Sequence, residues 1–205
     1  MDPITLRKAQ RHLARRDLVL KPLIRVVGPC TLRHSTDYFA TLVRSIISQQ
    51  ISTKAAIAIG NRLLATVKRF QPKRLLDASD DDLRAAGLSR GKQRSIRDLA
   101  EKCRDGTIPL RKIADLSDDD VVVVLTQVHG IGVWTAQMFL IFSLGRLDVL
   151  PVGDYGLRAG VRKHYALAEL PTKQALHELA EPWQPYRTVG TWYIWRSLGG
   201  VPQSD

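Results

Sequence analysis

Apolar residues recur along this chain every three or four positions, which is the spacing of one face of an α-helix. Between residues 37 and 49, for example, Phe39, Leu42 and Ile46 fall on the same side of a helix. The alternating pattern of a half-buried strand is scarce, so the chain is predicted to be all-α. The expected helices cover residues 4–16, 37–49, 52–68, 91–104, 117–128, 133–144, 155–165, 172–181 and 185–198, with shorter ones opening at Pro72 and Ser79.

Two of these helices carry strong start signals. Ser79 and Ser117 are each followed by three consecutive aspartates. A serine hydroxyl accepts a hydrogen bond from the first turn of a helix, and carboxylates are favoured at its positive end. Residues 121–125 are rich in β-branched valine, which favours a strand, but the acidic cap before them favours a helix.

The charge of the chain indicates its class of partner. Lys and Arg total 31 against 20 Asp and Glu, a net charge of +11. Such a field favours polyanions, with nucleic acid first and an anionic membrane surface second, although some basic proteins are merely soluble. No apolar run approaches the roughly 20 residues of a membrane span, and the N-terminus lacks a signal-peptide core. We therefore expect no membrane partner and a cytoplasmic location, nucleoid-associated in a prokaryote.

The two cysteines, Cys30 and Cys103, argue against several cofactors. Two thiols do not make a disulfide framework in a cytoplasmic chain and cannot hold an iron–sulfur cluster. No histidine or cysteine lies at a zinc-ligand spacing from either one. We expect no cofactor.

The densest motif is LTQVHGIGVWTA, residues 125–136, which places two glycines between two helices. Glycine allows positive φ and close approach of another backbone. Such a turn directs free amides and the positive end of the next helix at one point, which favours a phosphate. The alternative is an ordinary helix–helix turn with a glycine cap. The expected DNA-backbone contacts here are Gly130, Gly132, Val133 and Thr135.

Residues 128–136 resemble the hairpin of the helix-hairpin-helix DNA glycosylase superfamily. Members of that family carry a loop rich in Gly and Pro, followed by an Asp, about twenty residues after the hairpin. Here that loop reads LPVGDY, and Asp154 lies 22 residues after Gly132. Within the superfamily the chain is most similar to the 3-methyladenine DNA glycosylase II branch. Supporting segments are residues 46–52, 86–89, 183–187 and 192–196.

The resemblance implies one domain over residues 1–205, with two helical lobes flanking a cleft. One lobe is expected over about 37–130, and the other from the N-terminus plus about 131–205. It also implies a monofunctional glycosylase that acts as a monomer on double-stranded DNA, flips out an alkylated base of the 3-methyladenine type and hydrolyses its N-glycosidic bond. Trp134 stands where bifunctional relatives carry a Schiff-base lysine, so no lyase step is expected.

Asp154 is the expected catalytic residue. Breaking the bond builds positive charge on the sugar, which a fixed carboxylate stabilises while it orients the attacking water. The alternative is that Asp154 only caps the helix beginning at Tyr155. No clear second carboxylate serves as a general acid, and an alkylated cationic base leaves without protonation.

By resemblance, Trp134 and Trp183 line the base pocket, joined by Tyr38 and Tyr155. Packing in the core is the alternative for each aromatic, and it is favoured for Trp192 and Trp195.

Gln50 resembles the family's wedge, which fills the gap left by a flipped base, although a polar turn residue is the alternative. Lys92, Arg94 and Arg97 are candidates for phosphate contact, which a solvated basic face explains equally well. The carbonyls of Thr126, Val128 and Ile131 resemble those that bind a structural Na⁺ or K⁺ ion.

Two other functions remain open from the sequence. The first is a glycosylase for hypoxanthine, ethenoadenine or uracil, because pocket shape decides the substrate. The second is a non-catalytic helix-hairpin-helix module, which needs the hairpin but has no use for Asp154.

Overall fold

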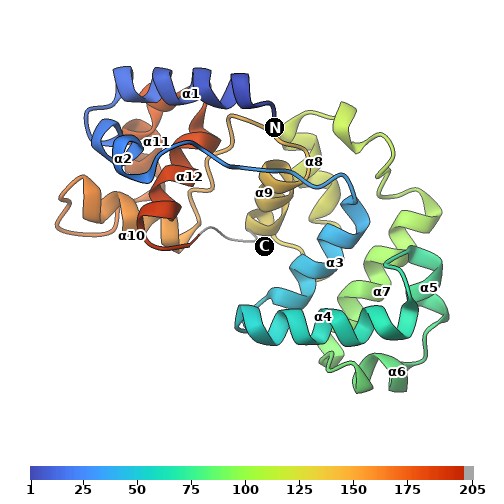
Figure 1. Ribbon diagram of the computed structural model, residues 1–205. Helices are drawn as coiled ribbons and strands as arrows, with labels where there is room; N and C mark the ends of the chain where they lie inside the picture. The colour runs from blue at the N-terminus through green and yellow to red at the C-terminus, as the bar shows by residue number, and fades with distance from the viewer. Residues whose placement is uncertain (201–205) are drawn as a thin grey trace. The chain divides into compact units, whose positions relative to one another are not determined.

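The computed structural model describes residues 1–200, and every regular element among them is a helix (Figure 1), which confirms the all-α prediction. Contacts divide the chain into two compact units. Among the described residues, the first comprises residues 1–34 and 140–200, and the second residues 35–139. The sequence placed this division near residue 131, whereas the contacts place it inside helix α9 (Val133–Phe142). None of the described helices is long and apolar enough to cross a membrane.

The first unit is built around its last helix, α12 (Arg187–Ser197), because every residue from Thr188 to Trp195 is buried. Helices α1, α2 and α10 all pack against it. The other elements of this unit are α1 (Pro3–Arg16), α2 (Leu20–Val27), α10 (Tyr155–His164), α11 (Lys173–Leu179) and the 3-10 turn η2 (Glu181–Trp183).

A buried carboxylate ties the start of this unit to its C-terminal part. Asp17 is 7% exposed and accepts the amides of Val19 and Leu20 through Oδ1, at 2.8 and 2.9 Å. Its Oδ2 accepts the Trp183 indole N–H at 2.7 Å and the Tyr165 hydroxyl. Burial, reinforced by the neighbouring Asp17 carboxylate, raises the pKa of Tyr165. Asp17 thus has the several donors that a buried carboxylate needs.

The second unit packs around α7 (Arg90–Asp105), which contacts α3, α5 and α6. Its core includes Leu42, Leu75, Ile96 and Leu99, all with no exposed surface. The other elements are α3 (Tyr38–Ser48), α4 (Thr53–Val67), α5 (Pro72–Asp77), α6 (Asp80–Ala85), the 3-10 turn η1 (Ile113–Asp115), α8 (Asp118–Leu125) and most of α9.

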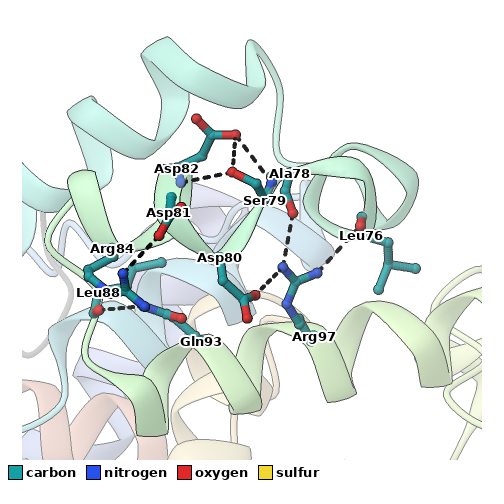
Figure 2. Close-up of polar contacts among 10 residues, drawn as sticks. All are labelled: Leu76, Ala78, Ser79, Asp80, Asp81, Asp82, Arg84, Leu88, Gln93 and Arg97. Carbon is teal, nitrogen blue, oxygen red and sulfur yellow. Dashed lines mark hydrogen bonds and ion pairs between the residues drawn. The ribbon is translucent and has the colours of Figure 1, made fainter.

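Both predicted acidic caps are present. Figure 2 shows Ser79 and Asp82 in a reciprocal capping box: the Ser79 hydroxyl accepts the Asp82 amide at 3.1 Å, and the Ser79 amide donates to Asp82 Oδ2 at 3.2 Å. The Ser117 hydroxyl accepts the Asp120 amide at 3.1 Å and starts α8. The valine run that follows is therefore helical, because the cap fixes the helix before strand preference can act.

The helix boundaries differ from the sequence prediction in two places. Helix α2 was not predicted, because its N-cap residue, Val19, has no capping side chain that would mark a helix start in the sequence. The Leu20 amide is capped instead by Asp17, which precedes the helix. Helix α8 ends at Leu125 instead of near Val128, because a turn bond from the Val128 amide to the Leu125 carbonyl, at 3.1 Å, begins the hairpin. The remaining predicted helices lie within two residues of the observed ends.

Candidate active site and nucleic-acid interface

Asp154 is the N-cap of α10 in the first unit. Its Oδ1 atom accepts two hydrogen bonds, one from the Leu157 amide at 2.6 Å and one from the Trp195 indole N–H at 2.9 Å. The residue is 7% exposed. Asp154 therefore does cap α10, as the alternative interpretation of the sequence predicted. The cap also holds its carboxylate at the positive end of this helix.

The two glycines beside Asp154 have different surroundings. A Cβ on Gly156 would lie 3.2 Å from Asp154 Oδ1 and 3.6 Å from the Trp195 ring. A Cβ on Gly153 would meet nothing within 4 Å. The absence of a side chain at 156 thus lets the carboxylate and the indole approach each other.

Trp195 contacts the candidate catalytic residue, although the sequence predicted only core packing for it. It is 2% exposed and stacks on Phe142, with ring centroids 6.0 Å apart and planes 21° apart. Its N–H still reaches Asp154, 41 positions away along the chain. A tryptophan in an apolar helix looks like core in any sequence, so no local signal marks this contact.

The two aromatic residues of the first unit that were predicted to contact the base differ in their exposure to solvent. Tyr155 is exposed at the start of α10, whereas Trp183 has no exposed surface and is bonded to Asp17. A ring with neither face open has no surface to stack on a base, so we leave Trp183 out of the proposed pocket. Trp192 is buried and packs edge-on against Tyr193.

The glycine hairpin of the second unit joins α8 to α9. The Val128 carbonyl accepts the Ile131 amide at 3.0 Å, and Gly130 has φ +80°. A Cβ on Gly130 would lie 2.5 Å from Ser95 Oγ, so both the turn and the packing require glycine there. Gly132 has no positive φ and no atom within 4 Å of its Cβ position. Local structure therefore does not require glycine at 132.

The start of α9 presents backbone donors. The Ala136 amide donates to the Gly132 carbonyl at 3.0 Å, and the amides of Val133 and Thr135 precede this bond. First-turn amides have no helical acceptor, so they are available to an anion. Gly132 and Val133 are exposed, whereas the Thr135 side chain is buried and packs. Thr135 can therefore contribute its amide but not its hydroxyl.

The hairpin is fastened to α7. The His129 amide donates to Asp98 Oδ2 at 2.7 Å, and Ser95 Oγ lies 3.2 Å from His129 Nδ1. Burial alone would raise the pKa of Asp98, but hydrogen bonds from Lys102 and from the His129 amide outweigh it and leave this pKa below its ordinary value. The hairpin therefore rests on an ionised carboxylate at neutral pH.

Gln50 lies at the exposed turn between α3 and α4 and has φ +58°. A residue other than glycine is uncommon in this left-handed region of the backbone. Adopting this conformation costs of order 1–3 kcal/mol, so the surroundings must hold Gln50 in it. The preceding residue supplies one restraint, since Gln49 Nε2 donates to the Gly130 carbonyl at 2.9 Å.

The two other aromatic residues predicted to contact the base, Trp134 and Tyr38, lie in the second unit. Trp134 is 37% exposed in the first turn of α9. Tyr38 is half-buried and packs edge-on against Phe139, with centroids 5.5 Å apart. Both therefore keep ring surface within reach of solvent.

Two of the three basic candidates are engaged inside the protein. Lys92 Nζ donates to the Ile47 carbonyl at 2.5 Å, and burial lowers the pKa of Lys92. Arg97 binds Asp80 at 2.6 Å and the carbonyl of Ala78 at 2.9 Å, as Figure 2 shows. We therefore assign Lys92 and Arg97 a structural role in place of the predicted contact with a DNA phosphate. Arg94 is exposed and has no ion pair among the described residues.

A surface hollow of about 600 Å³ adjoins Arg94 and His129. Four arginines line it, but so do Asp80, Asp98 and Glu101. This mixed charge does not make the hollow a strong anion site.

Within residues 1–200 no cluster of three acidic, histidine or cysteine side chains could hold a metal ion. The hairpin carbonyls are a different kind of donor. That of Val128 accepts one hydrogen bond, from Ile131, and a carbonyl has two lone pairs. Its second lone pair fits a monovalent cation.

A glycine hairpin between two helices, followed by an aspartate that caps a later helix, is the arrangement of a helix-hairpin-helix protein. The sequence profile of the HhH-GPD superfamily base excision DNA repair proteins matches residues 43–185. The chain belongs to this superfamily.

Named relatives and solved structures agree with this assignment. DNA-3-methyladenine glycosylase 1 of Schizosaccharomyces pombe is 36% identical over 200 residues, 94% of this chain and 88% of the relative. A DNA-3-methyladenine glycosidase structure from Bacillus halodurans superposes with a TM-score of 0.84 at 37% identity, covering 93% of this chain and 89% of the other. A 3-methyladenine DNA glycosylase from S. pombe, solved with abasic DNA, has a TM-score of 0.82 at 36% identity, covering 93% and 96%.

Proposed function

We propose that this chain is a monofunctional DNA glycosylase that removes alkylated bases of the 3-methyladenine type from double-stranded DNA. The observation that carries the proposal is Asp154, a nearly buried carboxylate held by the Leu157 amide and the Trp195 indole. A helix cap alone needs only the first of these bonds. The names of the relatives support the substrate class.

The proposed reaction begins with extrusion of the damaged nucleotide from the duplex. The bond between C1′ of the sugar and the base nitrogen breaks, and its electron pair leaves with the base. Positive charge develops on the sugar, and the Asp154 carboxylate stabilises it. Water then adds to C1′ and passes one proton to the Asp154 carboxylate, which releases it to solvent, so the products are the neutral free base and an abasic site.

The chemistry of the base explains why one carboxylate suffices. A base alkylated at a ring nitrogen is already a cation, so it needs no general acid to leave. A cation is attracted to an aromatic face by about 0.5–2 kcal/mol. We propose Trp134, Tyr38 and Tyr155 as the aromatic contacts, since all three keep exposed or half-buried ring surface.

The proposed DNA contacts lie in the second unit. The amides of Gly132, Val133 and Thr135 bind a backbone phosphate, and Arg94 binds another. Gln50 fills the gap left by the flipped base, in keeping with its exposed and strained turn. Gly130 shapes the hairpin.

We further propose that the protein acts as a monomer, and that the carbonyls of Thr126, Val128 and Ile131 hold a Na⁺ or K⁺ ion beside the hairpin. Such an ion would add positive charge near the phosphate.

The test is release of free base from a panel of oligonucleotides carrying alkylated bases, hypoxanthine, ethenoadenine or uracil. Asp154→Asn keeps the atom that caps α10 and removes the charge. We expect release of alkylated bases, with a loss of at least about 100-fold in the variant. Glu169→Gln removes an exposed carboxylate of the same unit and serves as the control. Base release that is equal in wild type and Asp154→Asn would overturn the catalytic role, and no release from any substrate would favour the binding module.

A further inference from the structure

One face of α7 contacts both turns that we assign to DNA. Lys92, Ser95 and Asp98 follow one another at intervals of three, so they lie along the same side of the helix. Lys92 reaches the Ile47 carbonyl at the end of α3, directly before the Gln50 turn. Ser95 and Asp98 reach His129 in the hairpin.

A side-chain bond closes this arrangement between the two turns. Gln49 Nε2 donates to the Gly130 carbonyl at 2.9 Å. The residue before the wedge is thus bonded to the glycine at the centre of the hairpin. Each turn is held to α7 by its own contacts and to the other turn by Gln49.

The Lys92 contact is unusual for a surface lysine. Its ammonium is partly buried, and desolvation lowers the pKa of Lys92. A surface lysine usually keeps its ammonium group in water. Lys92 instead donates to the Ile47 carbonyl, which lies in the last turn of α3 and therefore has no donor within the helix. The contact fixes the point from which the chain enters the Gln50 turn.

We propose that Gln49 and Lys92 are positioning residues: with Ser95 and Asp98 they form a brace that fixes the spacing between the Gln50 wedge and the phosphate-binding hairpin. This inference rests on the proposed function. A wedge held at a set distance from the gripped phosphate enters the duplex at the lesion without first having to be ordered. The brace acts on base flipping and not on bond cleavage.

The experiment compares single-turnover excision of one alkylated base in two duplexes, one with the base paired and one with it opposite an abasic position. Unpairing lowers the energy needed to flip the base. Gln49→Ala and Lys92→Met are expected to slow excision from the paired duplex roughly tenfold, the effect of about one hydrogen bond, and to have little effect on the unpaired one. Lys92→Arg should restore most of the rate.

The controls separate positioning from general damage. Gln71→Ala and Lys73→Met change exposed residues of the same unit that are remote from both turns in sequence, and should leave both rates unchanged. Melting temperatures of all variants are measured alongside. In the double variant with Gln50→Ala, Gln49→Ala should add almost nothing, because it acts through Gln50. Equal slowing on both duplexes, or additive effects of the two glutamines, would overturn the brace.

A second measurement needs no catalysis. Fluorescence of 2-aminopurine placed beside an abasic site reports local unstacking when the protein binds. At saturating protein, the two brace variants should give a weaker signal than wild type while the salt dependence of binding stays the same. An unchanged signal would refute the brace, whereas a wild type that unstacks DNA but releases no base would refute only the proposed reaction.

Discussion

The indole N–H of Trp195 donates to Asp154 Oδ1 over 2.9 Å, and both residues are buried. The bond joins α12 to the start of α10. Because the indole is itself held against Phe142, its N–H is a fixed reference for the carboxylate. Rotation of Asp154 would break a bond to a charged acceptor, which is typically stronger than one between neutral groups.

Trp195→Phe tests this relationship. Phenylalanine keeps much of the ring packing but has no N–H, so the carboxylate loses one of its two named donors. A bond to a charged group is worth about 1.5–3 kcal/mol, so single-turnover excision should fall about tenfold or more while the DNA dissociation constant stays the same. Trp192→Phe, another buried ring change in α12, is the control. Equal losses in the two variants would mean that packing alone matters.

Gly156→Ala should separate activity from stability. Alanine is favoured over glycine in a helix by about 0.5–1 kcal/mol, so the variant should melt no lower than wild type. Its Cβ would press on Asp154 Oδ1 from 3.2 Å, so excision should fall several-fold. Gly153→Ala has open space and should retain full activity. A fully active Gly156→Ala would show that the carboxylate tolerates displacement.

The two hairpin glycines should respond differently to alanine. Gly130→Ala combines a positive φ with a clash against Ser95, so it should lower both the melting temperature and DNA affinity. Gly132→Ala meets neither obstacle and should melt like wild type, but its methyl group would keep a phosphate from the backbone. DNA titrations over a range of salt concentrations measure the loss. Wild-type affinity in Gly132→Ala would argue against phosphate binding at this position.

Trp134→Lys should not produce a lyase. A lysine that attacks a sugar carbon must lose its proton, which requires burial or a neighbouring cation that lowers its pKa. Position 134 is 37% exposed, so an ammonium there stays hydrated and protonated. Borohydride trapping with a damaged duplex should give no covalent complex. A trapped complex would show that the position alone is sufficient for the chemistry.

Asp98 should make the stability of the second unit depend on acid. Its pKa is lowered in the folded protein, so the folded carboxylate binds protons less readily than the unfolded one. The resulting stability is present above the unfolded pKa, about 4, and is lost as the pH falls through the folded value. The free energy of unfolding of wild type should exceed that of Asp98→Asn by about 1 kcal/mol at neutral pH. Urea titrations at descending pH should show this gap closing, and a gap that widens in acid would contradict the assignment.

Local features of the sequence were sufficient for most of the helices, for the glycine hairpin and for Asp154. Ser79 and Ser117 cap helices within their own next three residues, so their effect needs no distant partner. The hairpin is equally local, because Gly130 and the start of α9 lie next to each other in the chain. The loop before Asp154 likewise leads directly into α10, the helix that Asp154 caps.

Tertiary structure alone decided the partners of the polar side chains that bond to residues far away in the chain. Lys92 and Arg97 look like DNA contacts in a basic helix, but they bind backbone carbonyls of α3 and of the chain after α5. Trp183 looks like a pocket aromatic, yet Asp17, 166 positions away, holds it in the core. A long side chain reaches many acceptors, and only packing decides which one is close. For the same reason the sequence pointed to Asp154, but only the folded protein pairs it with Trp195.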